Sequence, residues 1–178
     1  SIDMAFNKKR PDDRKTWLSK LDRNDALDQD QKRVTHTEFI NKDMIFFSNY
    51  DVERSIPNLV DGLKTSQRKI LYACFKRKLT KEIKVAQLSG YISEHSNYHH
   101  GEVSLHSTII AMAQNFVGSN NINTLVPQGG FGSRAQGGDD AASPRYIKTY
   151  LQKLTGNLFI EDDKTVLNLP VKSSILSD

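Results

Sequence analysis

The sequence predicts an α+β fold that is predominantly helical, and three observations lead to that prediction. Apolar residues recur at helical spacing in several segments before residue 116, glycines gather after it, and short β-type runs accompany those glycines. The chain of 178 residues is 37% hydrophobic, which suffices for one modest core. No stretch approaches the roughly 18 apolar residues that a membrane span needs, so no membrane partner is expected.

The first third of the chain predicts short helices separated by polar connections. A charge-dense start indicates one short helix over residues 12–21, followed by a solvated linker. Thr35 and Glu38 have the spacing of a capping box, a hydroxyl followed three residues later by a carboxylate, and predict a helix that begins there. Residues 48–51 look turn-like, and a further helix is expected over residues 52–60, with one proline in it.

Three longer amphipathic helices are expected next, over residues 66–77, 84–94 and 101–115. In the last of them the large apolar side chains fall on one stripe at helical spacing, which is typical of a helix with one buried face. That stripe consists of Leu105, Ile109, Met112, Ala113 and Phe116.

The sequence changes character after residue 116. Residues 117–140 hold six glycines, with Leu125-Val126 and Phe131 as candidate strands, and residues 144–154 return to helical spacing with a proline in the first turn. Two helices with a short polar connector, followed by a Gly-rich β section, are the order of a winged-helix domain, whose second helix enters the major groove of DNA. The predicted fold is therefore a winged-helix domain, a helix-turn-helix plus a small β wing, with an N-terminal helical extension.

The ends and the cysteine count indicate the cellular context. The chain opens in mid-pattern without Met and without a secretory signal, so we expect it to be a piece of a longer protein. Cys74 is the single cysteine, which excludes an intrachain disulfide, argues against a Cys-based zinc cluster and favours a reducing compartment.

Positive charge is concentrated in one stretch of the chain. Residues 64–84 carry eight Lys and Arg against one acidic residue, although the whole chain has a net charge of only +4. Such a local field suits a polyanion and predicts salt-sensitive binding of nucleic acid, duplex rather than single-stranded because aromatic residues are sparse. A solvated helix face remains the alternative.

The adjacent histidines His99 and His100 are the first candidate site. Two neighbouring histidines do not easily share one metal, so phosphate contact at the start of the next helix is favoured over metal binding, and a structural role stays open. No metal site is predicted in this chain, because its candidate acidic clusters are adjacent pairs only. Those pairs are Asp12-Asp13, Asp139-Asp140 and Asp162-Asp163.

Two further candidates are weak when taken alone. Residues 128–134 are glycine-rich, but they lack the spacing and the Lys of a nucleotide-binding P-loop, so a β-turn is the default interpretation. Arg145-Tyr146 is a common dipeptide, and in isolation it indicates packing plus a surface charge.

Several strings in order nevertheless resemble one family. They are Arg54-Ser55-Ile56-Pro57, Val60-Asp61-Gly62-Leu63-Lys64, Gln67-Arg68-Lys69-Ile70-Leu71, Lys84-Val85-Ala86-Gln87-Leu88, Tyr98-His99-His100-Gly101-Glu102, Ala113-Gln114-Asn115-Phe116-Val117-Gly118-Ser119-Asn120, Phe131-Gly132-Ser133-Arg134 and Ala142-Ser143-Pro144-Arg145-Tyr146-Ile147. Over about residues 35–160 the chain resembles the DNA-breakage domain of eukaryotic type IIA DNA topoisomerases.

The resemblance implies a division of the chain. Residues 1–30 would be the tail of the family's metal-binding Toprim domain and a linker, and residues 31–160 the winged-helix DNA-binding and cleavage domain. Residues 161–178 would be the start of a following domain or a disordered tail. The family also has Lys-Pro-Gly-Gln where this chain has Lys64-Thr65-Ser66-Gln67, so the loop loses a rigid turn.

The resemblance also implies roles for single residues. Tyr146 would be the nucleophile that forms a 5′-phosphotyrosine, with Arg145 stabilising the phosphate during transfer. Other side chains would contact the DNA, namely Lys64, Arg68, Lys69, His99 and His100. The group that takes the proton of Tyr146 stays open between His99, His100 and a metal-bound water.

For the parent enzyme the resemblance implies transient double-strand cleavage, strand passage and religation. It implies Mg²⁺ and ATP as cofactors of the full-length enzyme but none in this fragment, double-stranded DNA and a second copy of the chain as partners, and a nuclear location. The isolated fragment is expected to bind duplex DNA weakly and to cleave poorly or not at all. The alternatives are a non-enzymatic winged-helix module that binds duplex DNA and an interaction domain whose basic face binds an acidic protein.

Overall fold

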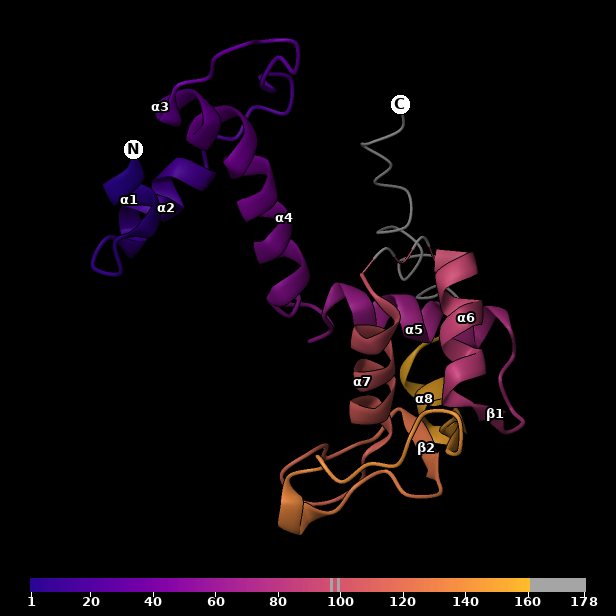
Figure 1. The fold of residues 1–178 in the computed structure, drawn as a ribbon. Coiled ribbons are helices and arrows are strands. Elements are labelled where there is room, and N and C mark those ends of the chain that lie inside the picture. The colour runs from indigo at the N-terminus through magenta and orange to yellow at the C-terminus, as the bar shows by residue number, and fades with distance from the viewer. Residues whose placement is uncertain (97, 99, 161–178) are drawn as a thin grey trace. The chain divides into compact units, whose positions relative to one another are not determined.

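A computed structural model describes residues 1–96, 98 and 100–160, and these residues form two compact units that divide between Asn58 and Leu59 (Figure 1). The expected domain boundaries near residues 30 and 160 stay predictions. None of the described helices is long and apolar enough to cross a lipid bilayer.

The first unit is helical throughout its described elements. It contains α1 (Ile2–Phe6), α2 (Pro11–Leu18), α3 (His36–Phe39), the π-helical segment η1 (Ile40–Met44) and α4 (Ile45–Ser55). Its small core consists of Ala5, Trp17, Ile40 and Ile45. Trp17 also donates a hydrogen bond from Nε1 to Asn41 Oδ1 at 3.0 Å, which ties α2 to η1.

The predicted capping box at the start of α3 is confirmed. Glu38 N–H donates to Thr35 Oγ1 at 3.2 Å, and Thr35 N–H donates to Glu38 Oε2 at 2.9 Å. Two of the backbone donors at this helix start are therefore paired.

The turn expected at residues 48–51 and the helix expected over 52–60 are wrong. One helical run continues from α3 through η1 into α4 and ends at Ser55. Ile56 is extended, with φ −92° and ψ 127°, because the following Pro57 disfavours the helical conformation of the residue before it. The proline thus ends this helix instead of kinking a second one.

The second unit has three longer helices and a small sheet. The helices are α5 (Thr65–Lys76), α6 (Val85–Ser96) and α7 (Glu102–Ala113), close to the predicted positions, and a short helix, α8 (Lys153–Leu158), follows the sheet. The predicted stripe of α7 is confirmed at Leu105, Ile109, Met112 and Ala113, all 5% exposed or less. These side chains join Ile70, Leu71, Leu88 and Ile92 in one core.

Three short strands form an antiparallel sheet in the order β1-β3-β2, with β1 at Ile83–Lys84, β2 at Leu125–Gln128 and β3 at Lys148–Leu151. Of these three strands, the one that comes last in the sequence is therefore the central one. Pro127 lies in β2, an edge strand, where a missing N–H is tolerated. The predicted fold class is confirmed: a predominantly helical α+β winged-helix architecture.

The helix expected over residues 144–154 is wrong, and so is the strand at Phe131. Residues 144–146 form a turn, β3 follows, and α8 begins only at Lys153. Phe131 is buried at 5% exposure but lies outside the strands. Pairing with both β1 and β2 makes residues 148–151 extended, and this contact with distant segments overrides the local helical spacing.

Candidate functional site

The centre of the candidate site is Tyr146, whose residue surface is 80% exposed. It ends a tight turn in which its N–H donates to the carbonyl of Ser143 at 2.9 Å. Arg145, the adjacent residue, is exposed as well. Both side chains are therefore accessible to a large ligand in solution.

The start of α6 fixes the backbone on both sides of Tyr146. Val85 N–H donates to the carbonyl of Ile147, and Ala86 N–H donates to the carbonyl of Pro144, each at 3.1 Å. The first amides of a helix have no partner within it, so these donors are available for the turn. Ile147, at 1% exposure, packs into the core. An exposed phenol is thus carried by a rigid backbone.

The cations predicted to contact DNA lie at the start of α5. Lys64 is the residue before this helix and is exposed, and its N–H donates to Gln67 Oε1 at 2.8 Å. Lys69 is half-buried, and this burial lowers the pKa of its ammonium group. Lys64 is therefore the more accessible of the two.

Arg68 is held by a carboxylate of its own unit. Its Nε and Nη2 atoms donate to the two oxygens of Asp61 at 2.8 and 2.7 Å, and the side chains of Arg68 and Asp61 are 14% and 20% exposed. Burial raises the pKa of Asp61, but hydrogen bonds from Arg68 and from Leu63 N–H outweigh it and leave that pKa below its usual value. The DNA contact predicted for Arg68 stays a prediction.

The structure describes only one of the two adjacent histidines. His99 lies outside the described residues. His100 is half-buried, with its ring edge-on to that of Tyr98 at a centroid distance of 5.5 Å. Gly101 then leads into α7 with φ +31°.

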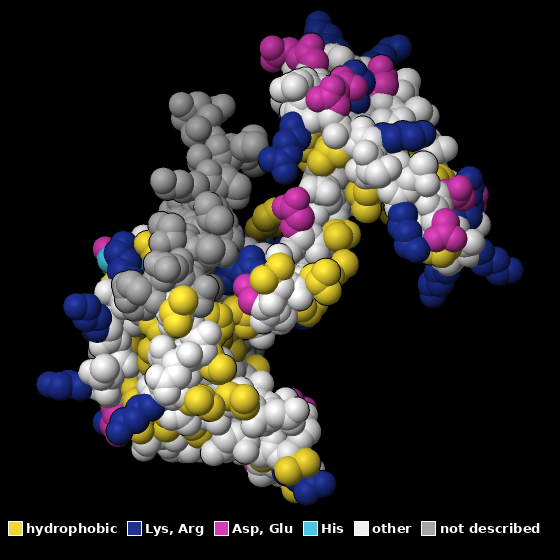
Figure 2. Space-filling view, turned by 180° about the vertical axis from the view of Figure 1, so that it is seen from behind, with side chains coloured by type: hydrophobic (Ala, Val, Ile, Leu, Met, Phe, Trp, Pro, Cys, Tyr) yellow, Lys and Arg dark blue, Asp and Glu magenta, His cyan; other side chains and the backbone are white. Residues whose placement is uncertain are grey.

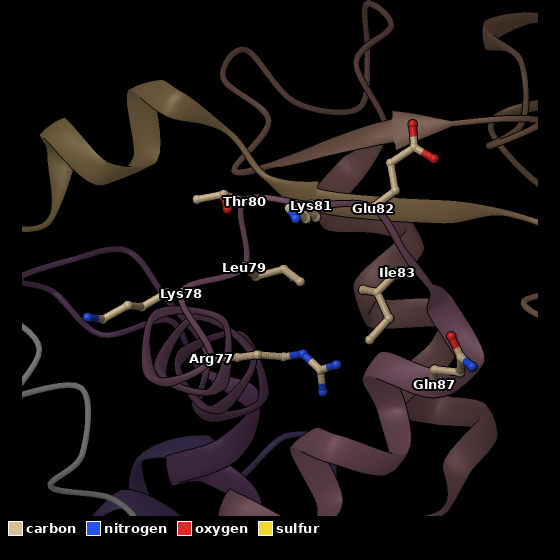
Figure 3. Close-up of a pocket in the computed structure, with 8 residues that line it drawn as sticks. All are labelled: Arg77, Lys78, Leu79, Thr80, Lys81, Glu82, Ile83 and Gln87. Atoms are coloured by element: carbon tan, nitrogen blue, oxygen red, sulfur yellow. The ribbon is translucent and has the colours of Figure 1, made fainter.

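A basic hollow of about 660 Å³ lies where α5 ends (Figure 3). Its lining includes Arg77, Lys78 and Lys81, and the guanidinium of Arg77 lies 4.8 Å from the ring centroid of Tyr91 on α6. The one carboxylate in that lining, Glu82, pairs with Lys148 at 3.2 Å, outside the set of lining residues. The predicted basic stretch thus includes a concave part with an excess of cations.

On one face of the second unit the positive charge is nonetheless dispersed (Figure 2). On the face shown in Figure 2, Lys and Arg side chains stand apart around this unit, with apolar side chains between them. Among the exposed apolar residues are Leu59, Val60, Val103 and Val117.

No three His, Cys, Asp or Glu side chains come together to hold a metal ion within residues 1–96, 98 and 100–160. These residues therefore do not fit the Mg²⁺ ion that the resemblance implies for the full-length enzyme. Asp162 and Asp163 lie outside the described residues.

Sequence reasoning missed the groups that hold the predicted residues in place. The amides of Val85 and Ala86 lie about 60 positions before the turn they bind, and no periodic pattern connects such positions. Asp61 precedes Arg68 by seven residues across a loop, so helix spacing does not reveal the pair. The available signal in the sequence was an acidic residue, Asp61, that precedes a glycine and a helix with basic residues in its first turns.

The fold and the site together define a class: a winged-helix protein that presents an exposed Arg-Tyr pair and carries exposed cations on the same unit. The chain belongs to the DNA gyrase/topoisomerase IV family, and the family model for the A-type chains of these enzymes matches residues 54–172. Residues 1–52 match the C-terminal associated domain of TOPRIM. The predicted resemblance to eukaryotic type IIA topoisomerases is confirmed.

Individual relatives agree with this family. The chain is 56% identical over 172 residues to a probable DNA topoisomerase 2 of Dictyostelium discoideum, and the match covers 96% of this chain and 11% of the relative. It is 57% identical over 168 residues to DNA topoisomerase 2 of Plasmodium falciparum, covering 94% of this chain and 12% of the relative. The chain thus spans about one-eighth to one-ninth of these relatives.

A solved structure matches as well. It is the crystal structure of the DNA-binding, cleavage and re-ligation domain of Plasmodium falciparum topoisomerase II, with a TM-score of 0.78 and 57% identity. The match covers 93% of this chain and 23% of the solved one.

Proposed function

We propose that this chain is the DNA-breakage part of a type II DNA topoisomerase, in which Tyr146 becomes covalently joined to a DNA 5′ end. The observation that carries the proposal is an 80% exposed tyrosine on a turn that two amides of α6 hold in place. A tyrosine with a purely structural role is usually buried, whereas a nucleophile that attacks DNA must be accessible from solvent.

The reaction conserves the energy of the phosphodiester. The phenol oxygen of Tyr146 attacks phosphorus, an O–P bond to tyrosine forms, and the bond between phosphorus and the 3′ oxygen breaks. The phenol gives up its proton, and the released 3′ oxygen takes one. Because the new ester keeps the energy of the old one, attack by the 3′ hydroxyl reverses the step and reseals the strand.

Arg145 supports this chemistry through its charge. A guanidinium is always protonated and matches two oxygens of a phosphate. Placed on the same turn as Tyr146, it can neutralise the non-bridging oxygens while phosphorus has both the attacking and the leaving oxygen near it. Positioned groups of this kind contribute about 3 kcal/mol to a transition state.

Duplex DNA is the proposed substrate, and the basic residues are its proposed contacts. Lys64 and Lys69 at the start of α5 would bind the backbone together with Arg68, His99 and His100. Phosphate contacts make affinity salt-dependent, with each contact contributing about 0.9 to the slope of log K against log salt. Lys64→Ala should therefore lower that slope by roughly one.

A double-strand break needs two nucleophiles, and the chain offers one candidate. The proposed working form is therefore a two-fold dimer of the longer protein, with one Tyr146 for each strand. Mg²⁺ and ATP are proposed cofactors of that longer protein, bound outside the described residues of this chain.

The test is denaturing recovery of a protein–DNA adduct from the longer protein that contains this chain. The wild type should yield an adduct attached through Tyr146, and Tyr146→Phe should bind duplex but yield none. Tyr150→Phe is the matched control, because it loses the same hydroxyl four residues further on, from a half-buried side chain in β3. It should form the adduct at the wild-type rate.

Other results would favour other functions. Normal DNA relaxation by Tyr146→Phe would refute the proposal and leave a non-enzymatic duplex-binding module. Duplex binding that is absent, or unchanged by salt, would instead favour a protein-interaction domain.

A nuclear location is the last part of the proposal. It rests on the resemblance to eukaryotic type IIA topoisomerases alone. A mitochondrial location is the competing possibility, because one relative, from Dictyostelium discoideum, is described as a mitochondrial DNA topoisomerase 2 and is 53% identical over 167 residues. Imaging the tagged longer protein tests the nuclear location, and staining confined to mitochondria would contradict it.

A further inference from the structure

The end of α7 carries a buried amide side chain that the proposed chemistry does not use. Gln114 is the residue after this helix and is 9% exposed. Its Nε2 donates to the carbonyls of Phe131 at 2.9 Å and Gly138 at 3.4 Å, which lie 17 and 24 residues further along the chain. Its Oε1 accepts a hydrogen bond from Ser119 Oγ at 3.2 Å. One side chain thus joins both sides of the glycine-rich loop to the end of α7.

The loop is shaped to admit this amide. A Cβ atom on Gly138 would lie 2.4 Å from Gln114 Nε2, and one on Gly132 would lie 2.6 Å from the carbonyl oxygen of Gly138. Both glycines have positive φ, +89° and +88°, which L side chains rarely adopt. The glycines therefore let the backbone close around the amide at a distance that side chains would prevent.

The same loop contacts the Tyr146 turn. Ala142 N–H donates to the carbonyl of Gly130 at 2.8 Å, just before the turn begins. On the other side, a Cβ on Gly129 would meet Ile147 Cγ2 at 3.2 Å, so the loop backbone lies against the residue after Tyr146. The turn is thus enclosed between the start of α6 and the glycine-rich loop.

We propose that Gln114 is a positioning residue for Tyr146. It ties the glycine-rich loop to α7, the helix predicted to enter the DNA groove, and the loop in turn holds the tyrosine turn. The position of the Tyr146 phenol is then fixed relative to α7. This inference rests on the proposed function.

The chemistry of the side chain favours this role over simple packing. A leucine or methionine would fill the same volume, but it would leave the carbonyl of Phe131 without its donor and that of Gly138 with the N–H of Ala141 alone, at 3.3 Å. An unpaired buried carbonyl is costly, so the loop at Phe131 would move to expose it to water. Such a movement displaces Ala142 and Ile147, the neighbours of the turn, while the cations at the start of α5 stay in place.

The test compares Gln114→Met with Gln136→Met in the longer protein. Gln136 lies on the same loop and is exposed, so the control makes the same change without removing a buried donor. Two quantities are measured at a temperature at which both variants are folded: duplex affinity and the rate of adduct formation in the bound complex. We expect Gln114→Met to bind duplex within about twofold of wild type and to form the adduct at least tenfold more slowly, with Gln136→Met unchanged.

A merely structural role gives a different pattern. It lowers the melting temperature and reduces binding and adduct formation together, in proportion to the folded fraction. An unchanged adduct rate in Gln114→Met, or an equal loss of affinity and rate, would overturn the inference. Absence of any Tyr146-dependent adduct in the wild type would instead overturn the proposed function.

A milder variant decides the question if Gln114→Met does not fold. Ser119→Ala removes the hydroxyl that orients the amide and leaves Gln114 in place. A several-fold slower adduct rate at wild-type affinity supports the positioning role. A wild-type rate contradicts it.

Discussion

The ion pair between Asp61 and Arg68 gives the sharpest stability prediction. Asp61→Ala leaves a guanidinium that is only 14% exposed without its carboxylate. Removing one partner of a fully buried pair costs about 3–5 kcal/mol, whereas a solvent-exposed pair contributes about 0–1 kcal/mol. At this intermediate burial, with two charge-assisted hydrogen bonds, we expect a loss of about 2 kcal/mol. This corresponds to a roughly thirtyfold rise in local opening.

Hydrogen exchange at the amides of α5 measures this opening directly. The matched control is Asp51→Ala, because Asp51 pairs with Arg54 at 2.8 Å but the two side chains are 45% and 39% exposed. Opening around Asp51 should rise by less than about fivefold, the limit for an exposed pair. Equal small effects at the two sites would refute the reasoning from burial.

The same pair predicts a pH dependence. The pKa of Asp61 is depressed in the folded state, so its contribution is fully present above the unfolded value of about 3.9. It is lost as the pH falls through the lower, folded pKa. The difference in exchange between wild type and Asp61→Ala should therefore be constant near neutral pH and shrink only in acid.

Three further predictions concern single positions. Thr35→Ala removes the acceptor of the capping box and should cost about 1 kcal/mol, measured as faster exchange of the α3 amides beside an unchanged α5. Gly132→Ala should lower the melting temperature more than Gly137→Ala, because both glycines have positive φ but a Cβ meets backbone only at Gly132, and equal shifts would contradict the steric argument. Cys74 should resist thiol reagents in the folded protein at neutral pH, because burial raises its pKa to about 12, and rapid labelling without unfolding would be inconsistent with that burial.

Local patterns predicted the helices of the second unit well. The stripe from Leu105 to Ala113 is buried as expected, because a helix carries its apolar face in its own spacing. The capping box at Thr35 also depends on neighbours in sequence, and the structure has it. In both cases the forces that decide the structure act within a few residues.

In the second unit, predictions failed where distant segments decide the structure. The spacing of residues 144–154 suited a helix, but pairing with β1 and β2 makes residues 148–151 a strand. Tyr146 and Arg145 could be chosen from the resemblance, yet their exposure and the amides that hold them depend on α6. The charge of Arg68 was likewise evident from the sequence, whereas its ion pair with Asp61 was not.

The order of the sheet has a consequence for synthesis of the protein. Its two outer strands are translated first, and the strand that joins them comes last, two residues after the tyrosine. A nascent chain that stops before Lys148 has no partner for β1 or for β2, and the turn has no strand to lead into. The ribosome must therefore release this segment before the three-stranded sheet can assemble, so the turn of Tyr146 gains its fixed setting only after β3 has been synthesised.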